Sequence, residues 1–422
     1  MSLVALACDW YGRNRETLTA VDALLGGSLL TWGVLRQPFR LPRRNRPHRS
    51  DHPPTTTEMF GRAVEQIGSA KLAVCLGGIH TLDRIAGESR PDQAAVTEIL
   101  AALIRQRAPW PDPAAADPPA STQDAVTMPD SYRRQRSADV AAALDVIIRR
   151  RATDGIAPDA RLNLTRTNLA RASLKQAPLH GADLFAANLQ QADLAGADLS
   201  QADLRRACLH RATLVGANLA GANLTGSNLT QANGRAADLT GATISWADLS
   251  GVNLYAANLS GATILEARLG GANLHRADLR GARLGDCDLD EAQLGSADLS
   301  GARLERVSLR GAKLGRSNLS QAFLYGADLA AADLQAANLR RADLSWADLS
   351  GANLTWADLS DAILYGAKLT GARLTGADLR RADIRAADLT GACIDGAVLQ
   401  DAIVLTPANG DAKPGAAPRA AE

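Results

Sequence analysis

Aromatic side chains are scarce in this sequence, with only 6 Trp, 5 Tyr and 4 Phe among 422 residues. Aromatic residues usually dominate the core of a globular domain, so a conventional globule does not account for most of the chain. An excess of one charge is also lacking, because 46 basic residues balance 45 acidic ones and leave a net charge of +1. This balance removes the simplest electrostatic arguments for a nucleic-acid-binding protein or a polyanion mimic.

The residues that usually carry chemistry are few and scattered. Five cysteines are an odd number, and no two have the CxxC spacing of a zinc or redox motif (Cys8, Cys75, Cys208, Cys287 and Cys393). They therefore predict neither a disulfide framework nor a zinc site, and they fit a reducing compartment. The six histidines form no metal or nucleophile–base pattern, and no phosphate loop is present. We expect a protein that is not an enzyme, with no catalytic residue, metal or cofactor.

A five-residue repeat is what the sequence has in abundance. From Leu164 to Leu399 every fifth residue is a large aliphatic one, with 43 Leu, 4 Ile and one Gly among 48 positions. Two residues earlier lies a second fixed position, which is Ala in 41 of the 48 cases, and an Asp or Asn usually stands between the two. No insertion interrupts this repeat array, which extends over residues 161–406.

A period of five fits neither a helix nor a plain strand. At ~100° per residue a helix would scatter the leucines around its whole surface, and a strand would send successive leucines to opposite faces. A strand-like step followed by a two-residue corner solves the problem, because Ala and Leu then both point inward and the Asp or Asn points outward. Four such sides close a square coil, so each coil holds four pentapeptides. Gly234 lacks the inward leucine, so we expect a local void or a shifted rung there.

The pattern A(D/N)LxG, as in GANLTGSNLT and WADLSGANLT, resembles the pentapeptide-repeat family. The resemblance implies a mainly β fold, the right-handed quadrilateral β-helix, with about 12 coils of four pentapeptides over residues 161–406. At ~4.8 Å per coil the rod would be roughly 58 Å long. The outward Asp residues then form solvated ladders, and replacing one of them with Ala is expected to be nearly neutral.

The chain before the repeat array predicts a small α-helical module over residues 55–108. The segment TTTEMFGRAVEQIG begins with a capping box between Thr55 and Glu58 and ends at Gly68. Two further helices follow, in KLAVCLGGIHTLDRIAGES and from Pro91 onward.

Other segments connect or flank these two parts. Residues 109–136 contain six prolines and are predicted to be a linker. Residues 137–160 are predicted to form a helix that caps the first coil, because an open β-helix end could recruit further strands. The tail, residues 407–422, is predicted to be disordered.

Residues 1–54 are predicted to form an N-terminal hydrophobic helix and a basic linker. The helical module resembles that of membrane-linked, actinobacterial-type pentapeptide-repeat proteins, in FGRAVEQIGSAKLAVCLGGIHTLDRIA and EILAALIRQRAPWP. In those relatives a hydrophobic segment precedes the module, and residues 17–35 occupy that place here. The uncharged run 23–35 has 13 residues, short of the ~20 that a span needs. A membrane contact and an ordinary amphipathic helix both remain open, so we expect a cytoplasmic bacterial protein, at the inner face of the membrane if the contact forms.

The resemblance also implies a functional alternative, since the family's best-known activity is to mimic DNA and so inhibit or protect a type II topoisomerase such as gyrase. A mimic needs a surface of one charge, whereas residues 161–406 carry 25 acidic and 24 basic residues. Mimicry is therefore the second hypothesis, and nucleic acid itself is not an expected partner. The first hypothesis is a non-enzymatic interaction or scaffold protein that presents its β-helical surface to a protein partner, whose identity the sequence does not give.

Two surfaces are candidates for contacts. When the repeat array is folded at four pentapeptides per coil, one aromatic and apolar cluster falls on one side of three consecutive coils: Phe323, Tyr325, Trp346, Ile363 and Tyr365. Such clusters often mark contact sites, although stacking that only stiffens the exterior would give the same pattern. The last coil is also apolar, and a two-fold dimer through it is predicted, with a cap folded back by residues 403–405 as the alternative. The residues of this predicted dimer contact are Val398, Leu399, Ile403 and Leu405.

Overall fold

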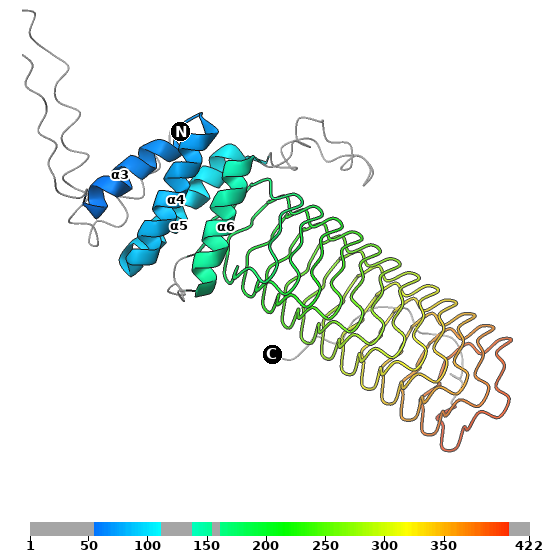
Figure 1. Cartoon of the computed structure of the whole chain (residues 1–422). Helices are drawn as coiled ribbons and strands as arrows, with labels where there is room; N and C mark the ends of the chain where they lie inside the picture. Colours follow the sequence, from blue (N-terminus) through cyan, green and yellow to red (C-terminus); the bar gives the residue numbers. More distant parts are fainter. Residues whose placement is uncertain (1–54, 111–136, 154–160, 405–422) are drawn as a thin grey trace, which may run out of the picture. The chain divides into compact units, whose positions relative to one another are not determined.

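A computed structural model of the chain describes residues 55–110, 137–153 and 161–404. The chain divides into two compact units, Met1–Thr167 and Asn168–Glu422 (Figure 1). The predictions for residues 1–54, for most of the proline-rich linker and for the tail lie outside the described residues. None of the described helices is both long and apolar enough to cross a membrane.

Four helices form the described part of the first unit: α3 (Thr56–Ile67), α4 (Leu72–Glu88), α5 (Arg90–Arg107) and α6 (Ala138–Thr153). The predicted capping box is confirmed, because the Glu58 backbone N–H donates to Thr55 Oγ1 (3.3 Å) and the Thr55 N–H donates to Glu58 Oε2 (3.2 Å). Pro91 lies in the first turn of α5, where its missing N–H costs nothing. The small helical module is therefore present as the sequence predicts.

Helix α4 lies at the centre of this unit and packs against α3, α5 and α6. Its buried residues include Ile79 and Leu82. Gly78 allows a close approach to α3, since a Cβ atom there would lie 2.8 Å from the Ala63 carbonyl oxygen. Ion pairs fasten α6 to α4, with Arg150 Nε 2.8 Å from Asp83 Oδ1.

The first residues of the repeat array belong to the helical unit. The Arg105 guanidinium of α5 donates to the Asn163 carbonyl oxygen (2.6 Å). Just beyond α5, Pro109 forms an antiparallel bridge with Thr167. Pro109 is therefore part of the ordered unit and not of a linker. The capping of the first coil by α6 stays a prediction.

The second unit is a stack of coils in which the bridge pattern recurs after every four pentapeptides (Figure 1). Each outward residue forms a parallel bridge with the equivalent residue of the next coil, from Asn168 with Asn188 to Asp383 with Ile403. The bridges are single pairs, and no continuous strand occurs in the described part of the chain. The inward Ala and Leu positions are buried from Leu169 to Ile384, with exposed fractions of 7% or less. The predicted inward and outward assignment is confirmed.

Every corner is a tight turn with a left-handed residue. At most corners the N–H of the next inward residue, usually Ala, donates to the carbonyl oxygen of the Leu before the corner, as from Ala172 to Leu169 (3.0 Å). The second corner residue has a φ between 51° and 71° at all 48 corners from Arg166 to Asp401, and 19 of these residues are Gly. Glycine recurs there because it alone adopts this conformation without steric cost. The residue types at the corner predict a solvated turn, whereas the left-handed backbone requirement is evident only in the structure.

The outward Asp and Asn side chains also close the corners. Asp278 Oδ1 accepts the backbone N–H of Arg280 two residues later (3.1 Å), and the same bond recurs along the repeat array. Amide side chains connect neighbouring coils as well, as where Asn218 Nδ2 donates to Asp198 Oδ1 (3.0 Å). These residues do more than solvate the surface, so the expectation of a nearly neutral Asp→Ala change is revised.

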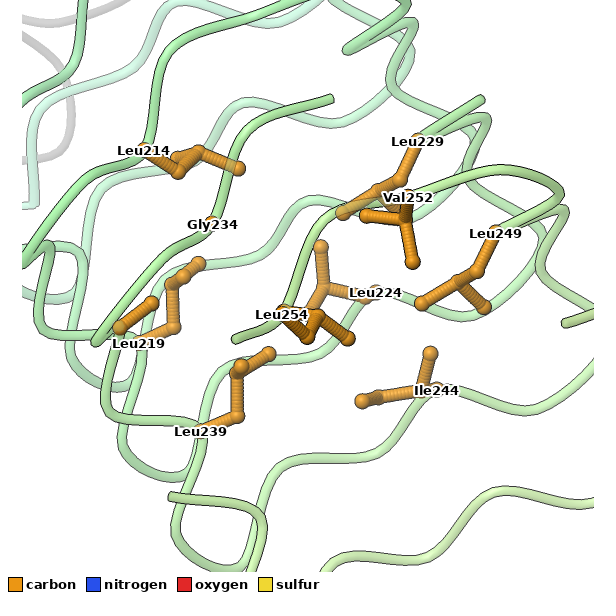
Figure 2. A pocket seen from close by; sticks show the side chains of 11 residues that line it. Leu214, Leu219, Leu224, Leu229, Gly234, Leu239, Ile244, Leu249, Val252 and Leu254 are labelled. Atoms are coloured by element: carbon orange, nitrogen blue, oxygen red, sulfur yellow. The ribbon is translucent and has the colours of Figure 1, made fainter. Parts of the chain in front are cut away.

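Gly234 leaves a gap in the interior, as predicted. A small apolar cavity of about 10 Å³ lies beside it, lined mainly by leucines of the neighbouring rungs (Figure 2). Leu254 leans toward the empty space, because its Cδ2 atom would lie 2.9 Å from a Cβ placed on Gly234. The loss of one inward leucine at Gly234 thus leaves only a local cavity, and the bridge pattern continues without a break.

The inward and outward positions should differ in what a truncation costs. We expect Leu279→Ala to lower the free energy of unfolding by about 2–5 kcal/mol, because it opens a cavity in a fully buried rung. Asp278→Ala should cost about 0.5–1.5 kcal/mol, the usual net value of a lost hydrogen bond. Denaturant unfolding of the variants measures both. Asp278→Asn, which keeps the corner acceptor, is the control and should stay close to wild type; equal losses for Leu279→Ala and Asp278→Ala would contradict the assignment.

Candidate contact site on the repeat array

The described residues contain no arrangement that suggests catalysis. No group of three or more His, Cys, Asp or Glu side chains in residues 55–110, 137–153 and 161–404 is placed to hold a metal ion. The Cys287 thiol occupies an inward Ala position, and burial raises its pKa to about 11, so it is protonated at neutral pH. The cavity at Gly234 has no polar lining. The exposed surface of the coils is therefore where function is best sought.

The five predicted residues lie together, and we name them the aromatic patch: Phe323, Tyr325, Trp346, Ile363 and Tyr365. Phe323 and Ile363 stand in one outward column, because each bridges to Asp343 between them. Their side chains are 48% and 43% exposed, where the repeat normally places Asp or Asn. Tyr325, Trp346 and Tyr365 occupy the adjoining corner of the same coils. The patch thus extends over three coils, with Asp343 between its two apolar outward residues.

Contacts inside the patch hold its rings in place. Trp346 and Tyr365 meet edge to face, with ring centroids 5.7 Å apart and planes at 81°. The Arg385 guanidinium lies 5.8 Å from the centre of the Tyr365 ring. The same guanidinium binds Asp383 through Nε (2.8 Å) and Nη2 (2.7 Å). Side chains held this way lose little freedom on binding, which favours a contact surface.

Arginines border the patch on its other side, a feature that the sequence analysis missed. Arg381 and Asp361 lie one coil apart at the corner that precedes the outward column of the patch. Arg381 Nε is 2.6 Å from Asp361 Oδ1, and Arg340 Nε is 3.6 Å from Asp361 Oδ2. The hydrogen bond from Arg381 lowers the pKa of the Asp361 carboxyl group. Arg341 is exposed and makes no ion pair with any described residue. Trp, Tyr and Arg together are the residues most enriched at binding hot spots.

The tryptophans of the repeat array all occupy strained backbone positions. Trp246, Trp346 and Trp356 are second corner residues with φ of 56°, 60° and 61°, a conformation that costs a residue with a Cβ roughly 1–2 kcal/mol. The Trp346 ring lies against the next coil, since a Cβ on Gly366 would be 2.8 Å from its Cε3. A bulky residue in a left-handed position indicates either a packing gain that offsets the strain or a function.

The last coil is exposed in the described part of the chain. Ile394, Val398, Leu399 and Ile403 are 40–45% exposed, and Val404 is 64% exposed. Ile403 continues the outward column, because its N–H donates to the Ala382 carbonyl oxygen (2.9 Å). The alternative in which residues 403–405 fold back over the last rung is therefore wrong for Ile403. Leu405 lies outside the described residues.

Comparison with known proteins identifies the repeat. The family model described as pentapeptide repeats matches in eight copies, which together extend over residues 182–401. Among solved structures, HetL of the cyanobacterium Nostoc sp. strain PCC 7120, a pentapeptide repeat protein involved in heterocyst differentiation regulation, is 37% identical. That match covers 51% of this chain and 89% of HetL, with a TM-score of 0.27.

Two further structures are similar. Rfr23, a pentapeptide repeat protein of the cyanobacterium Cyanothece 51142, is 36% identical over 22% of this chain and 63% of its own, with a TM-score of 0.22. QnrB1, a plasmid-mediated fluoroquinolone resistance protein, is 20% identical over 42% of this chain and 90% of its own, with a TM-score of 0.34. No curated protein matches the chain.

A substitution at Trp346 separates the two interpretations of the patch. Trp346→Gly removes the ring but also removes the left-handed strain, so we expect the free energy of unfolding to change by less than about 1 kcal/mol. Trp346→Ala keeps the strain and should be less stable than Trp346→Gly by about 1 kcal/mol. Denaturant unfolding measures both variants. A loss of several kcal/mol in Trp346→Gly would show that the indole serves to stiffen the coils.

Proposed function

The chain belongs to the pentapeptide-repeat family, and from this premise we propose that it is a non-enzymatic scaffold protein that binds a protein partner through the aromatic patch. The observation that carries the proposal is the exposure of large apolar side chains on one side of consecutive coils, where the repeat otherwise places Asp or Asn. Isolated exposed apolar residues are ordinary, whereas a contiguous group with arginines around it favours a contact.

The chemistry of the patch defines the partner. Phe323 and Ile363 offer exposed apolar side chains on either side of Asp343, and the aromatic rings at the corner offer both apolar faces and hydroxyl groups. Arg341 adds a positive charge beside the patch that no described carboxylate pairs with, whereas Arg381 and Arg385 are paired with Asp361 and Asp383. A partner segment with apolar side chains flanked by carboxylates would complement both features.

A location near the inner face of a bacterial membrane is part of the proposal. It is supported by the hydrophobic segment 17–35, by the arginines that follow it and by the resemblance of the helical module to membrane-linked relatives. A second part is a homodimer through the C-terminal coil. Val398, Leu399 and Ile403 are exposed at the end of the stack, and a two-fold contact would bury them together with unpaired backbone groups.

The dimer has a direct test. Light scattering of the full-length protein should give twice the mass of the 44.2 kDa chain, and Leu399→Asp with Ile403→Asp should give the monomer mass. The matched control is Phe323→Asp with Ile363→Asp, which adds the same charge elsewhere and should remain dimeric. A monomeric wild-type protein at high concentration would remove the dimer from the proposal.

DNA mimicry stays the second candidate, because one side of the coils does carry an unbroken column of Asp and Asn. Its ten members begin at Asp198 and end at Asp378. Arginines on the adjoining corner neutralise part of it, as where Arg280 Nη2 lies 2.5 Å from Asp278 Oδ2 and Arg380 Nη2 lies 2.6 Å from Asp378 Oδ2. A protein that displaces DNA, a polyanion, from its binding surface must itself present a continuous run of negative charge. This partly neutralised column therefore supports mimicry less well than the patch supports a protein contact.

The patch is tested by replacing its two apolar outward residues with the Asp that the repeat usually has at that position. Phe323→Asp and Ile363→Asp introduce the residue that the same column carries at Asp343 and Asp383, so the coils should fold normally. Tagged full-length protein should capture a partner from its own cells, and the double variant should retain less than about one tenth of it, as expected when a hot spot is lost.

The matched control is Trp356→Gly, which removes a 65% exposed ring from a different corner and leaves a residue that this column already carries at Gly376. Capture should be unchanged in this control. Equal capture by the double variant and the wild-type protein would overturn the patch proposal. Inhibition of gyrase supercoiling by the wild-type protein, weakening with added salt, would instead promote mimicry.

A further inference from the structure

A second exposed surface lies on the corner of the coils half a turn away from the corner that carries Tyr325, Trp346 and Tyr365. The two corners are two pentapeptides apart in a coil of four, so they are diagonally opposite. We name the second surface the basic edge and define it by six corner residues: Arg235, Tyr255, His275, Arg276, Arg316 and Trp356. It uses none of the residues of the aromatic patch. The lipid contact inferred for it rests on the membrane location that is part of the proposed function, and it names the surface that would make that contact.

The arginines of the basic edge form no ion pair among the described residues, although the outward column of Asp and Asn from Asp198 to Asp378 adjoins this corner. Between Lys175 and Gly376 this corner carries no Asp or Glu at all. Arg235, Arg276 and Arg316 are exposed and form no ion pair with any residue that the structure describes. Arginines elsewhere in the repeat array are commonly paired with a carboxylate of the same or a neighbouring coil: Arg205 with Asp203, Arg280 with Asp278, Arg306 with Asp286 and Arg385 with Asp383.

The rings of the basic edge are stacked on one another. The Arg235 guanidinium lies 5.1 Å from the centre of the Tyr255 ring. The Tyr255 ring in turn stacks on His275, with centroids 5.7 Å apart and planes at 23°. Arg276 Nη1 donates to the Tyr255 hydroxyl (3.3 Å). Because both faces of the Tyr255 ring are covered, no nucleotide base can stack on it, and the usual anchor of single-stranded nucleic acid is absent at this position.

The basic edge is a convex corner that extends along the stack of coils. Arg276, Arg316 and Trp356 stand in one column at intervals of two coils, which is about 10 Å at ~4.8 Å per coil. From Arg235 to Trp356 the basic edge extends over six coils, or about 29 Å. A convex corner cannot enclose a peptide or a nucleic-acid strand, whereas it can lie along a flat surface.

Trp356 adds an apolar contact to the basic edge. Its side chain is 65% exposed, and the indole lies against Gly376 of the next coil, since a Cβ there would be 2.5 Å from Trp356 Cε3. Only one face of the ring is thus covered. Unpaired arginines with Tyr and Trp are the residues that occupy the headgroup layer of membranes.

We propose that the basic edge lies on the surface of a membrane that contains anionic lipids. In this arrangement Arg235, Arg276 and Arg316 bind lipid phosphates, and the indole of Trp356 enters the headgroup layer. The diagonally opposite corner, with its part of the aromatic patch, then faces away from the lipid.

Vesicle binding of the full-length protein tests the proposal. The probes are vesicles of phosphatidylglycerol and phosphatidylcholine in equal parts and vesicles of phosphatidylcholine alone. The triple variant Arg235→Gln, Arg276→Gln and Arg316→Gln should bind the anionic vesicles about 100-fold more weakly, because each cation near such a surface contributes about a factor of five. Gln already occupies this corner at Gln335, so the coils should fold normally.

A matched variant controls for charge alone. Arg206→Gln, Arg268→Gln and Arg283→Gln remove three exposed arginines that also lack an ion pair among the described residues but lie on other sides. This control should lose less than about fivefold in vesicle binding, since its residues do not reach the lipid surface. Equal losses in the two triple variants would overturn the proposal, as would unchanged binding of the first or equal binding of wild type to both kinds of vesicle.

A second readout compares single tryptophan variants, so any quenching of Trp10 and Trp32 in residues 1–54 is common to all of them. Brominated lipids quench tryptophans that enter the headgroup layer, and Trp356→Phe should remove part of the quenching seen with wild type. Trp246→Phe, at the opposite corner and 63% exposed, should not change it. Quenching that is independent of Trp356 would overturn the proposal. Loss of binding to an acidic protein or nucleic acid in the first triple variant, with vesicle binding intact, would assign the basic edge to that partner instead.

Discussion

The interior of the coil imposes one constraint on which the rest of the structure depends: each side must bury one small and one large aliphatic side chain, two residues apart. Ala and Leu meet this requirement almost without exception, and both are buried along the stack. Each side then presents its third residue and its corner to the solvent. Because backbone bridges connect every coil to the equivalent positions of the next, a local fault such as Gly234 does not shift the register. Stability accumulates by stacking, as in other repeat proteins.

The corners carry a second requirement that shapes the surface. Their second residue is left-handed, and Gly relieves the resulting strain. The outward Asp or Asn closes the same turn by accepting a backbone N–H, as Asp278 does from Arg280. Deviations from Gly at the corner or from Asp in the outward column therefore have a cost. Ile363 is such a deviation, which makes it a better candidate for function than an exposed residue on an unconstrained surface would be. Non-Gly residues occupy 29 of the 48 corners, so the left-handed position alone does not single out Trp346.

Two opposite corners of the coils differ in chemistry. The corner with Trp346 and Tyr365 borders apolar side chains and paired arginines. The corner with Arg276 and Arg316 carries unpaired cations and no carboxylate in eleven successive coils. A square coil separates such surfaces simply because each position in the period of four pentapeptides keeps its direction along the stack. One chain can thereby carry the proposed protein-binding surface and the proposed lipid-binding surface without either one affecting the interior.

The sequence by itself determined the period, the inward and outward positions, the small helical module with its capping box at Thr55, and the gathering of Phe323 and Ile363 on one side. These features follow from a strict repeat and from local hydrogen bonding, both of which act over a few residues. Only the tertiary structure decided which arginines are paired, where the Trp346 ring lies, and that Ile403 continues the stack. Those outcomes depend on side chains a full coil apart in the chain, such as Arg381 with Asp361 and Arg235 with Tyr255. Alternative pairings of long, exposed side chains differ little in energy, so spacing alone does not select among them.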